Sequence, residues 1–188
     1  MPSLWQLLTA GRGRQMDPLQ VSMTGVRMGE RFLQIGCDDR ALLSGLAAKV
    51  GLSGAAAVAS LSDAAAARAA GVGAKVGALI DVRPITADDL PFDSDGFDMI
   101  VVDDTRGTFG SLTAPARASI LRDARRVVRP GGRIEVVEGV GAGGMLGGAV
   151  KRPAAYNVVD DLESAGFKPV RALAERDGYR FVEGLRPT

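Results

Sequence analysis

The sequence contains no histidine and only one cysteine among its 188 residues. Without histidine, Ser-His-Asp catalysis, Cys-His catalysis and every zinc site that needs an imidazole ligand are excluded. The single cysteine, Cys37, can form neither an internal disulfide nor a four-cysteine metal site. We therefore expect no metal, and any proton transfer must rely on carboxylates or tyrosine.

Strong charge of one sign and long hydrophobic runs are also missing. Lys and Arg total 23 against 22 for Asp and Glu, and the net charge of +1 gives no long-range attraction to nucleic acid or anionic membranes. The longest apolar, glycine-rich run, residues 139–150, is too short to span a bilayer as a helix. The N-terminal apolar patch precedes its arginines, the reverse of a signal peptide. These features predict a soluble, cytoplasmic protein without a membrane span.

The hydrophobic residues that are present, 46% of the chain, suit one globular domain with a substantial core. From residue 31 onward, short apolar runs alternate with alanine-rich helical stretches, as in an α/β domain with a mostly parallel sheet. We expect residues 1–30 to be an N-terminal extension or lid and residues 31–188 to form the domain. The expected strands are 31–36, 56–60, 75–81, 97–104 and 133–138, followed by a hairpin that turns at Asp177 and Gly178. The expected helices are 41–50, 62–71, one starting near Thr113, and 156–166.

In such a doubly wound sheet of about seven strands, ligands bind beyond the carboxyl ends of the strands. Acidic residues are concentrated there, and Asp103 and Asp104 end the clearest strand. They could serve as proton acceptors, with Asp103 the first candidate, or simply cap the following turn. Glu138 and Tyr156 are further candidate bases.

Three segments of the chain resemble class I S-adenosylmethionine-dependent methyltransferases, in particular the small-molecule subgroup related to ubiquinone and menaquinone biosynthesis enzymes. They are RFLQIGCDDR (31–40), DLPFDSDGFDMIVV (89–102) and ILRDARRVVRPGGRIEVVEG (120–139). The resemblance implies a Rossmann-like fold that ends in an antiparallel hairpin. It also implies S-adenosylmethionine as the cofactor.

The same resemblance implies where the cofactor binds. Gln34 stands at the family's acidic position of the first strand, and Asp38 and Arg40 stand where the family has glycines. Ser60, followed by Leu61, falls at the ribose position, and the adenine position falls on Thr86, with Asp81 as its substitute. The implied cofactor-binding residues are Gln34, Gly36, Cys37, Asp38, Ser60, Leu61, Asp81 and Thr86.

Two functions follow from these features. The first is methyl transfer from S-adenosylmethionine to a small or hydrophobic acceptor, which requires mainly positioning and removal of a proton. The second is a catalytically inactive protein of the same fold that acts as a binding or scaffold partner, because the cofactor motifs depart from the family pattern. A homo-oligomer or a partner subunit is compatible with both. The arginines at 117, 122, 125, 126 and 129 are interpreted as a solvated helix face rather than a nucleic-acid surface.

Overall fold

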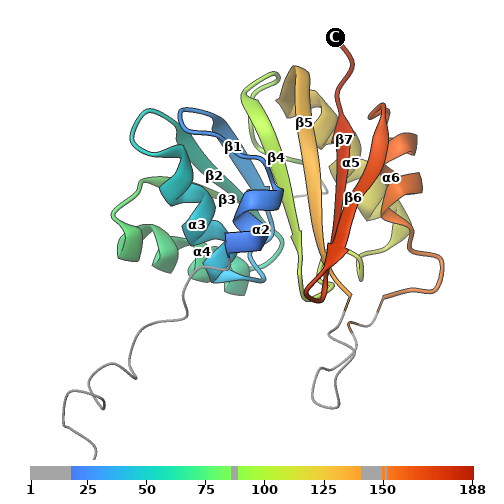
Figure 1. Cartoon of the computed structure of the whole chain (residues 1–188), viewed down its shortest axis with the longest axis horizontal. Coiled ribbons are helices and arrows are strands. Elements are labelled where there is room, and N and C mark those ends of the chain that lie inside the picture. Colours follow the sequence, from blue (N-terminus) through green and yellow to red (C-terminus); the bar gives the residue numbers. More distant parts are fainter. Residues whose placement is uncertain (1–17, 86–88, 141–149, 151) are drawn as a thin grey trace, which may run out of the picture.

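A computed structural model describes residues 18–85, 89–140, 150 and 152–188. Its sheet has seven strands in the order β3-β2-β1-β4-β5-β7-β6 (Figure 1). The strands are β1 (Arg31–Ile35), β2 (Ala55–Ser60), β3 (Ile80–Pro84), β4 (Phe97–Asp104), β5 (Val128–Gly139), β6 (Val170–Arg176) and β7 (Tyr179–Leu185). Neighbouring pairs among β1 to β5 are parallel, whereas β7 is antiparallel to both β5 and β6. The predicted Rossmann-like sheet with a C-terminal antiparallel hairpin is confirmed.

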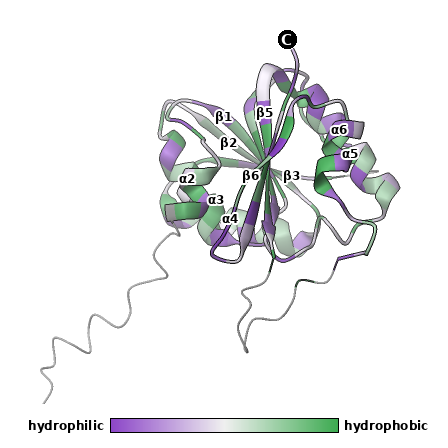
Figure 2. Ribbon diagram, turned by 45° about the vertical axis from the view of Figure 1, so that its right-hand side comes forward, coloured by the Kyte–Doolittle hydropathy of each residue, from purple (hydrophilic) through white to green (hydrophobic). Residues whose placement is uncertain are grey.

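Helices cover both faces of this sheet because successive strand residues point to opposite sides. On β1, Phe32 packs in one core with the helices α2 (Pro18–Met23), α3 (Arg40–Val50) and α4 (Asp63–Val76). Leu33 and Ile35 pack in the other core, against α5 (Ala114–Val127) and α6 (Val158–Ser164). Figure 2 shows hydrophobic and hydrophilic stretches on α5 and α6, as expected for helices with one covered side.

The expected boundary between α4 and β3 is wrong. Helix α4 begins after Ser62, whose hydroxyl accepts a bond from the N–H of Ala65, but it does not stop at Gly71. It continues to Val76 and ends at Gly77, whose φ of 65° gives a left-handed cap that glycine adopts without strain. Consequently β3 starts at Ile80 rather than at residue 75.

The rest of the chain follows the prediction more closely. Strand β4 has the predicted bounds, and Thr113 caps α5 through the N–H of Ala116. The β6–β7 hairpin turns at Asp177 and Gly178, both with positive φ, as the Asp-Gly pair predicts. Strand β5 begins at Val128, five residues earlier than expected, and includes the Pro-Gly-Gly stretch.

Part of the predicted N-terminal extension packs onto the domain. Leu19, Val21 and Met23 of α2 contact the core beneath α3, and Val26 is fully buried. The lid role of residues 1–30 stays a prediction, and residues 1–17 lie outside the described part. In the described ranges, no helix combines the length and the hydropathy needed to cross a membrane.

Candidate active site

Strand β4 delivers two adjacent aspartates to the carboxyl edge of the sheet. Asp103 and Asp104 are both fully buried, and their side chains have different partners because residues alternate along a strand. Asp103 faces the loop that follows β1, whereas Asp104 faces the segment that follows β5. We call their surroundings the Asp103 half and the Asp104 half.

In the Asp103 half, the carboxylate accepts four hydrogen bonds from uncharged groups, one of them from the Thr105 N–H at 3.3 Å. The other three donors are the Asp39 N–H at 2.8 Å, the Thr105 hydroxyl at 2.7 Å and the Gln34 amide at 3.3 Å. Burial raises the pKa of Asp103 to about 7, although the bonds from Asp39 and Thr105 oppose this rise. The group therefore changes protonation near neutral pH.

Gln34 and Gly36 lie beside Asp103 at the end of β1. The Gln34 side chain is buried and donates to the Gly36 carbonyl at 3.1 Å, but its Oε1 has no hydrogen-bond partner among the described residues. Gly36 has a φ of 82°, and a Cβ there would lie 3.3 Å from the Asp103 carbonyl oxygen and 3.4 Å from Leu61 Cδ1. Only glycine adopts this backbone without strain.

Asp38 closes the space between two loops. Its carboxylate accepts the Thr108 hydroxyl at 2.7 Å and the N–H groups of Arg106 and Thr108 at 3.3 Å. On the other side, Arg68 of α4 lies 3.9 Å from Asp38 and donates to the Cys37 carbonyl at 2.6 Å. The loop after β1 is thus tied to both the β4–α5 loop and α4.

The remaining predicted cofactor residues do not all converge here. Ser60 is the last residue of β2, and its hydroxyl donates to the Arg83 carbonyl at 3.4 Å. Burial raises the pKa of the Cys37 thiol to about 11, so it is not a nucleophile at neutral pH. Asp81 lies at the start of β3, exposed and paired with Arg83 at 2.7 Å. The prediction that Asp81 lies at the carboxyl end of β3 was wrong, because α4 extends further and β3 starts later. Thr86 lies outside the described residues.

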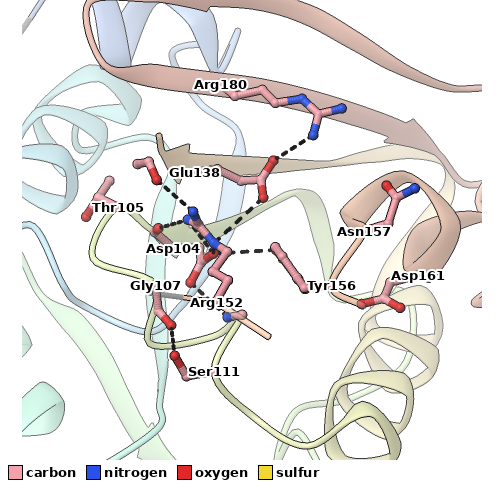
Figure 3. Close-up of polar contacts among 12 residues, drawn as sticks. Asp104, Thr105, Gly107, Ser111, Glu138, Arg152, Tyr156, Asn157, Asp161 and Arg180 are labelled. Carbon is pink, nitrogen blue, oxygen red and sulfur yellow. Dashed lines mark hydrogen bonds and ion pairs between the residues drawn. The ribbon is translucent and has the colours of Figure 1, made fainter. Parts of the chain in front are cut away.

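In the Asp104 half, an arginine connects the ends of β4 and β5 (Figure 3). Arg152 Nε donates to Asp104 at 2.9 Å, and Arg152 Nη2 lies 2.8 Å from the same carboxylate. The Gly110 N–H and the Tyr156 hydroxyl donate to Asp104 at 2.9 and 3.4 Å. Burial raises the pKa of Asp104, and Arg152 opposes the rise.

Glu138 of β5 is the second buried carboxylate in this half. Its contacts are looser than those of Asp104: Arg180 lies at 3.5 Å and Arg152 at 4.0 Å. Burial raises the pKa of Glu138. Burial likewise raises the pKa of the Tyr156 hydroxyl, and the negative charges of Glu138 and Asp104 raise it further. Three of the four candidate bases, all except Asp103, therefore lie together.

Two glycines permit this close arrangement. A Cβ at Gly110 would lie 3.0 Å from both Arg152 Nε and Asp104 Oδ2. A Cβ at Gly139 would lie 2.0 Å from the Thr105 carbonyl oxygen, which no side chain allows. Arg152 also donates to the Gly139 carbonyl at 2.7 Å, so the backbone is part of the site.

Sequence reasoning missed several residues that hold the two halves together. Arg152 and Arg180 are 48 and 42 positions away from their carboxylate partners, and no motif marks them. Arg117 also differs from expectation, because it is buried rather than solvated and pairs with Asp161 at 2.8 Å. The other residues missed are Arg68 and Thr108.

The strand order and the loops at this edge define a Rossmann-like domain of the class I methyltransferase type. Residues 8–142 match the ubiE/COQ5 methyltransferase family. The chain belongs to that family, and S-adenosylmethionine is the cofactor of these enzymes. No curated protein sequence is significantly similar to the chain.

Solved structures share this fold at low sequence identity. A SAM-dependent methyltransferase from Aquifex aeolicus has a TM-score of 0.75 at 21% identity, covering 90% of this chain and 89% of that one. The cyclase SpnF has a TM-score of 0.64 at 19% identity, covering 90% and 79%. PigF with SAH has a TM-score of 0.59 at 21% identity, covering 87% and 51%. These likenesses concern the fold.

The described residues fit the cofactor, with one group in conflict. Gly36 allows close backbone approach, and the unpartnered Gln34 Oε1 is an acceptor suited to an ammonium group. The conflict is Asp38, whose carboxylate fills the loop and repels another carboxylate at short range.

Proposed function

We propose that the protein transfers a methyl group from S-adenosylmethionine to a small or hydrophobic acceptor bound at the Asp104 half. The observation that carries the proposal is the convergence of Asp104, Glu138 and Tyr156 beside the end of β4. These groups come from separate parts of the chain. Their burial favours proton transfer within the site over exchange with bulk water.

The cofactor would supply an electrophilic methyl group on its sulfonium. We assign its binding to Gln34, Gly36, Cys37, Ser60 and Leu61, with Asp38 displaced. A Cβ at Gly36 would lie 3.4 Å from Leu61 Cδ1, so the Leu61 side chain borders this glycine. Ser60 ends the adjacent strand. These assignments follow the predicted motif positions, without Asp81.

The protein's own groups would remove the acceptor's proton. Glu138 is the better proton acceptor, because its nearest cations lie at 3.5 and 4.0 Å, whereas Arg152 lies 2.8 Å from Asp104. Asp104 works with it by holding Arg152 and the Tyr156 hydroxyl in place. Asp103 instead positions the loop after β1 through Asp39.

The charge balance of the Asp104 half supports an uncharged acceptor. The carboxylates of Asp104 and Glu138 are matched by the guanidinium groups of Arg152 and Arg180. A charged acceptor would add a buried charge that no group of these two pairs is left to compensate, which is costly. The cytoplasmic location and the oligomeric state stay predictions.

A calorimetric titration with S-adenosylhomocysteine, joined to an activity assay, tests this function. We expect saturable binding, and release of S-adenosylhomocysteine when the enzyme is given S-adenosylmethionine and a panel of small neutral phenols and quinols. Glu138→Gln should lower kcat 10²-fold or more, in the range of general-base catalysis, with binding unchanged. The control, Glu175→Gln, alters an exposed glutamate of β6. Unchanged kcat in Glu138→Gln would refute the assignment.

The second candidate function is a non-catalytic binding protein, and the closure by Asp38 favours it. Asp38→Gly, alone and with Arg40→Gly, separates the two. If the natural chain does not bind S-adenosylhomocysteine at millimolar concentration and the variants do, the fold is intact but blocked, and the non-catalytic function holds. If both bind, Asp38 is displaced readily, as the enzymatic function requires.

A further inference from the structure

A cavity of about 550 Å³ lies between α3 and α4, behind the loop that follows β1. Four cationic side chains line it, and they come from three segments: Arg40 from α3, Arg68 and Lys75 from α4, and Arg106 from the β4–α5 loop. Its volume lies within the range of small-molecule sites, about 300–1,000 Å³. The Asp104 half contributes none of its lining.

Most of this positive charge is not neutralised within the described part of the protein. The side chains of Arg40, Lys75 and Arg106 have no hydrogen bond or ion pair to any residue of the described ranges. On other exposed surfaces, Arg83 and Arg129 each pair with an aspartate at 2.7 Å. The cavity is thus lined by cationic side chains that are not paired with carboxylates of the described residues.

The two carboxylates of the cavity are directed at protein donors. Asp38 accepts the Thr108 hydroxyl at 2.7 Å, and Asp39 accepts the Ala41 N–H at 2.8 Å as the N-cap of α3. Only Arg68 shares its charge with one of them, at 3.9 Å from Asp38. With four cations and two such carboxylates, the lining carries a net positive charge.

We propose that this cavity binds a small phosphate-bearing molecule. Guanidinium and ammonium donors from three segments match the several acceptor oxygens of a phosphate group, and arginine binds such oxygens in pairs. The cavity has the size of a small-molecule site rather than a polymer groove. S-adenosylmethionine is a poor occupant because its sulfonium and ammonium groups would meet Arg40, Lys75 and Arg106.

Titration with inorganic pyrophosphate at constant ionic strength tests the proposal. We expect saturable one-to-one binding by calorimetry, weakened at least tenfold in the double variant Arg40→Ala with Lys75→Ala. Both side chains are exposed, so the substitutions should leave the fold intact, as circular dichroism would verify. The matched control is Arg122→Ala, an exposed arginine of α5 on the opposite face of the sheet, which should bind as the natural chain does.

Further arms identify the source of the phosphate. Inorganic phosphate and a nucleoside diphosphate are titrated alongside pyrophosphate, and tighter binding of the nucleoside diphosphate indicates an organic phosphate as the ligand. Equal affinity of the two diphosphates supports recognition of the phosphate group alone. The proposal would be overturned by a heat of titration that depends on ionic strength and does not saturate. It would also be overturned if Arg122→Ala lost as much affinity for pyrophosphate as the double variant.

Discussion

Asp103 and Asp104 are adjacent, chemically identical and both fully buried, yet they have opposite environments. Asp103 is surrounded by uncharged donors, and its pKa is raised to about 7. Asp104 is bound to the guanidinium of Arg152. The alternation of side chains on β4 is the cause, because it directs one carboxylate to the loop after β1 and the other to the segment after β5.

The difference teaches that the two halves are stabilised by different interactions. In the Asp103 half, neutral hydrogen bonds hold a group that can take up a proton without leaving an unpaired cation. In the Asp104 half, buried ion pairs hold the chain together across 48 positions, and neither partner tolerates loss of the other. The halves should therefore respond differently to substitution and to pH.

The largest effect is expected for Arg152→Ala. This change leaves Asp104 without its buried cation and Glu138 with only Arg180. The free energy of unfolding should fall by about 3–5 kcal/mol, measured by urea denaturation at pH 7.

Two further variants show whether the buried charge is the cause. Arg180→Ala removes a more exposed partner at 3.5 Å and should cost under about 1 kcal/mol. Adding Asp104→Asn to Arg152→Ala should restore part of the loss. Equal losses in Arg152→Ala and Arg180→Ala would show that the buried Asp104–Arg152 pair is not the cause of the loss.

An intermediate effect is expected for Asp103→Asn, and it depends on pH. The pKa of Asp103 is about 7 in the folded protein against an ordinary value of 3.8. Between these values the folded state retains a proton that the unfolded state has lost, so this group lowers stability as pH rises from about 4 to about 7. Above pH 7 its contribution no longer changes.

Asp103→Asn should remove this slope, with a difference on the order of 3 kcal/mol between the ends of the window. Urea denaturation at a series of pH values measures it. Glu135→Gln is the comparison variant. Burial raises the pKa of Glu135 to about 8, so this variant should remove a decrease of stability with pH that extends up to about pH 8. A slope unchanged by Asp103→Asn would show that the carboxylate stays ionised when buried.

The smallest effect is expected for Thr108→Val, which removes the hydroxyl donor to Asp38. Loss of one hydrogen bond should cost about 1 kcal/mol of unfolding free energy. Because the freed carboxylate can turn away, S-adenosylhomocysteine should bind several-fold more tightly by calorimetry. Thr105→Val, the matched control, removes the equivalent bond to Asp103 and should not improve binding.

Much of the fold could be predicted because its signals are local. The apolar run of β4 and the Asp177-Gly178 turn each depend on a few neighbouring residues, and both lie where predicted. The end of α4 could not be placed, since Gly71 is tolerated inside a helix that Gly77 terminates. That one boundary moved Asp81 away from the carboxyl edge.

By itself, the sequence determined the Rossmann-like sheet with its C-terminal antiparallel hairpin through its family motifs, and it named Asp103, Asp104, Glu138 and Tyr156 as candidate groups. Only the tertiary structure decided that three of them meet around Arg152 while Asp103 belongs to the other half. The reason is physical: periodicity fixes which side of a strand a residue occupies. Its partner depends on how distant segments pack, and no local pattern encodes that.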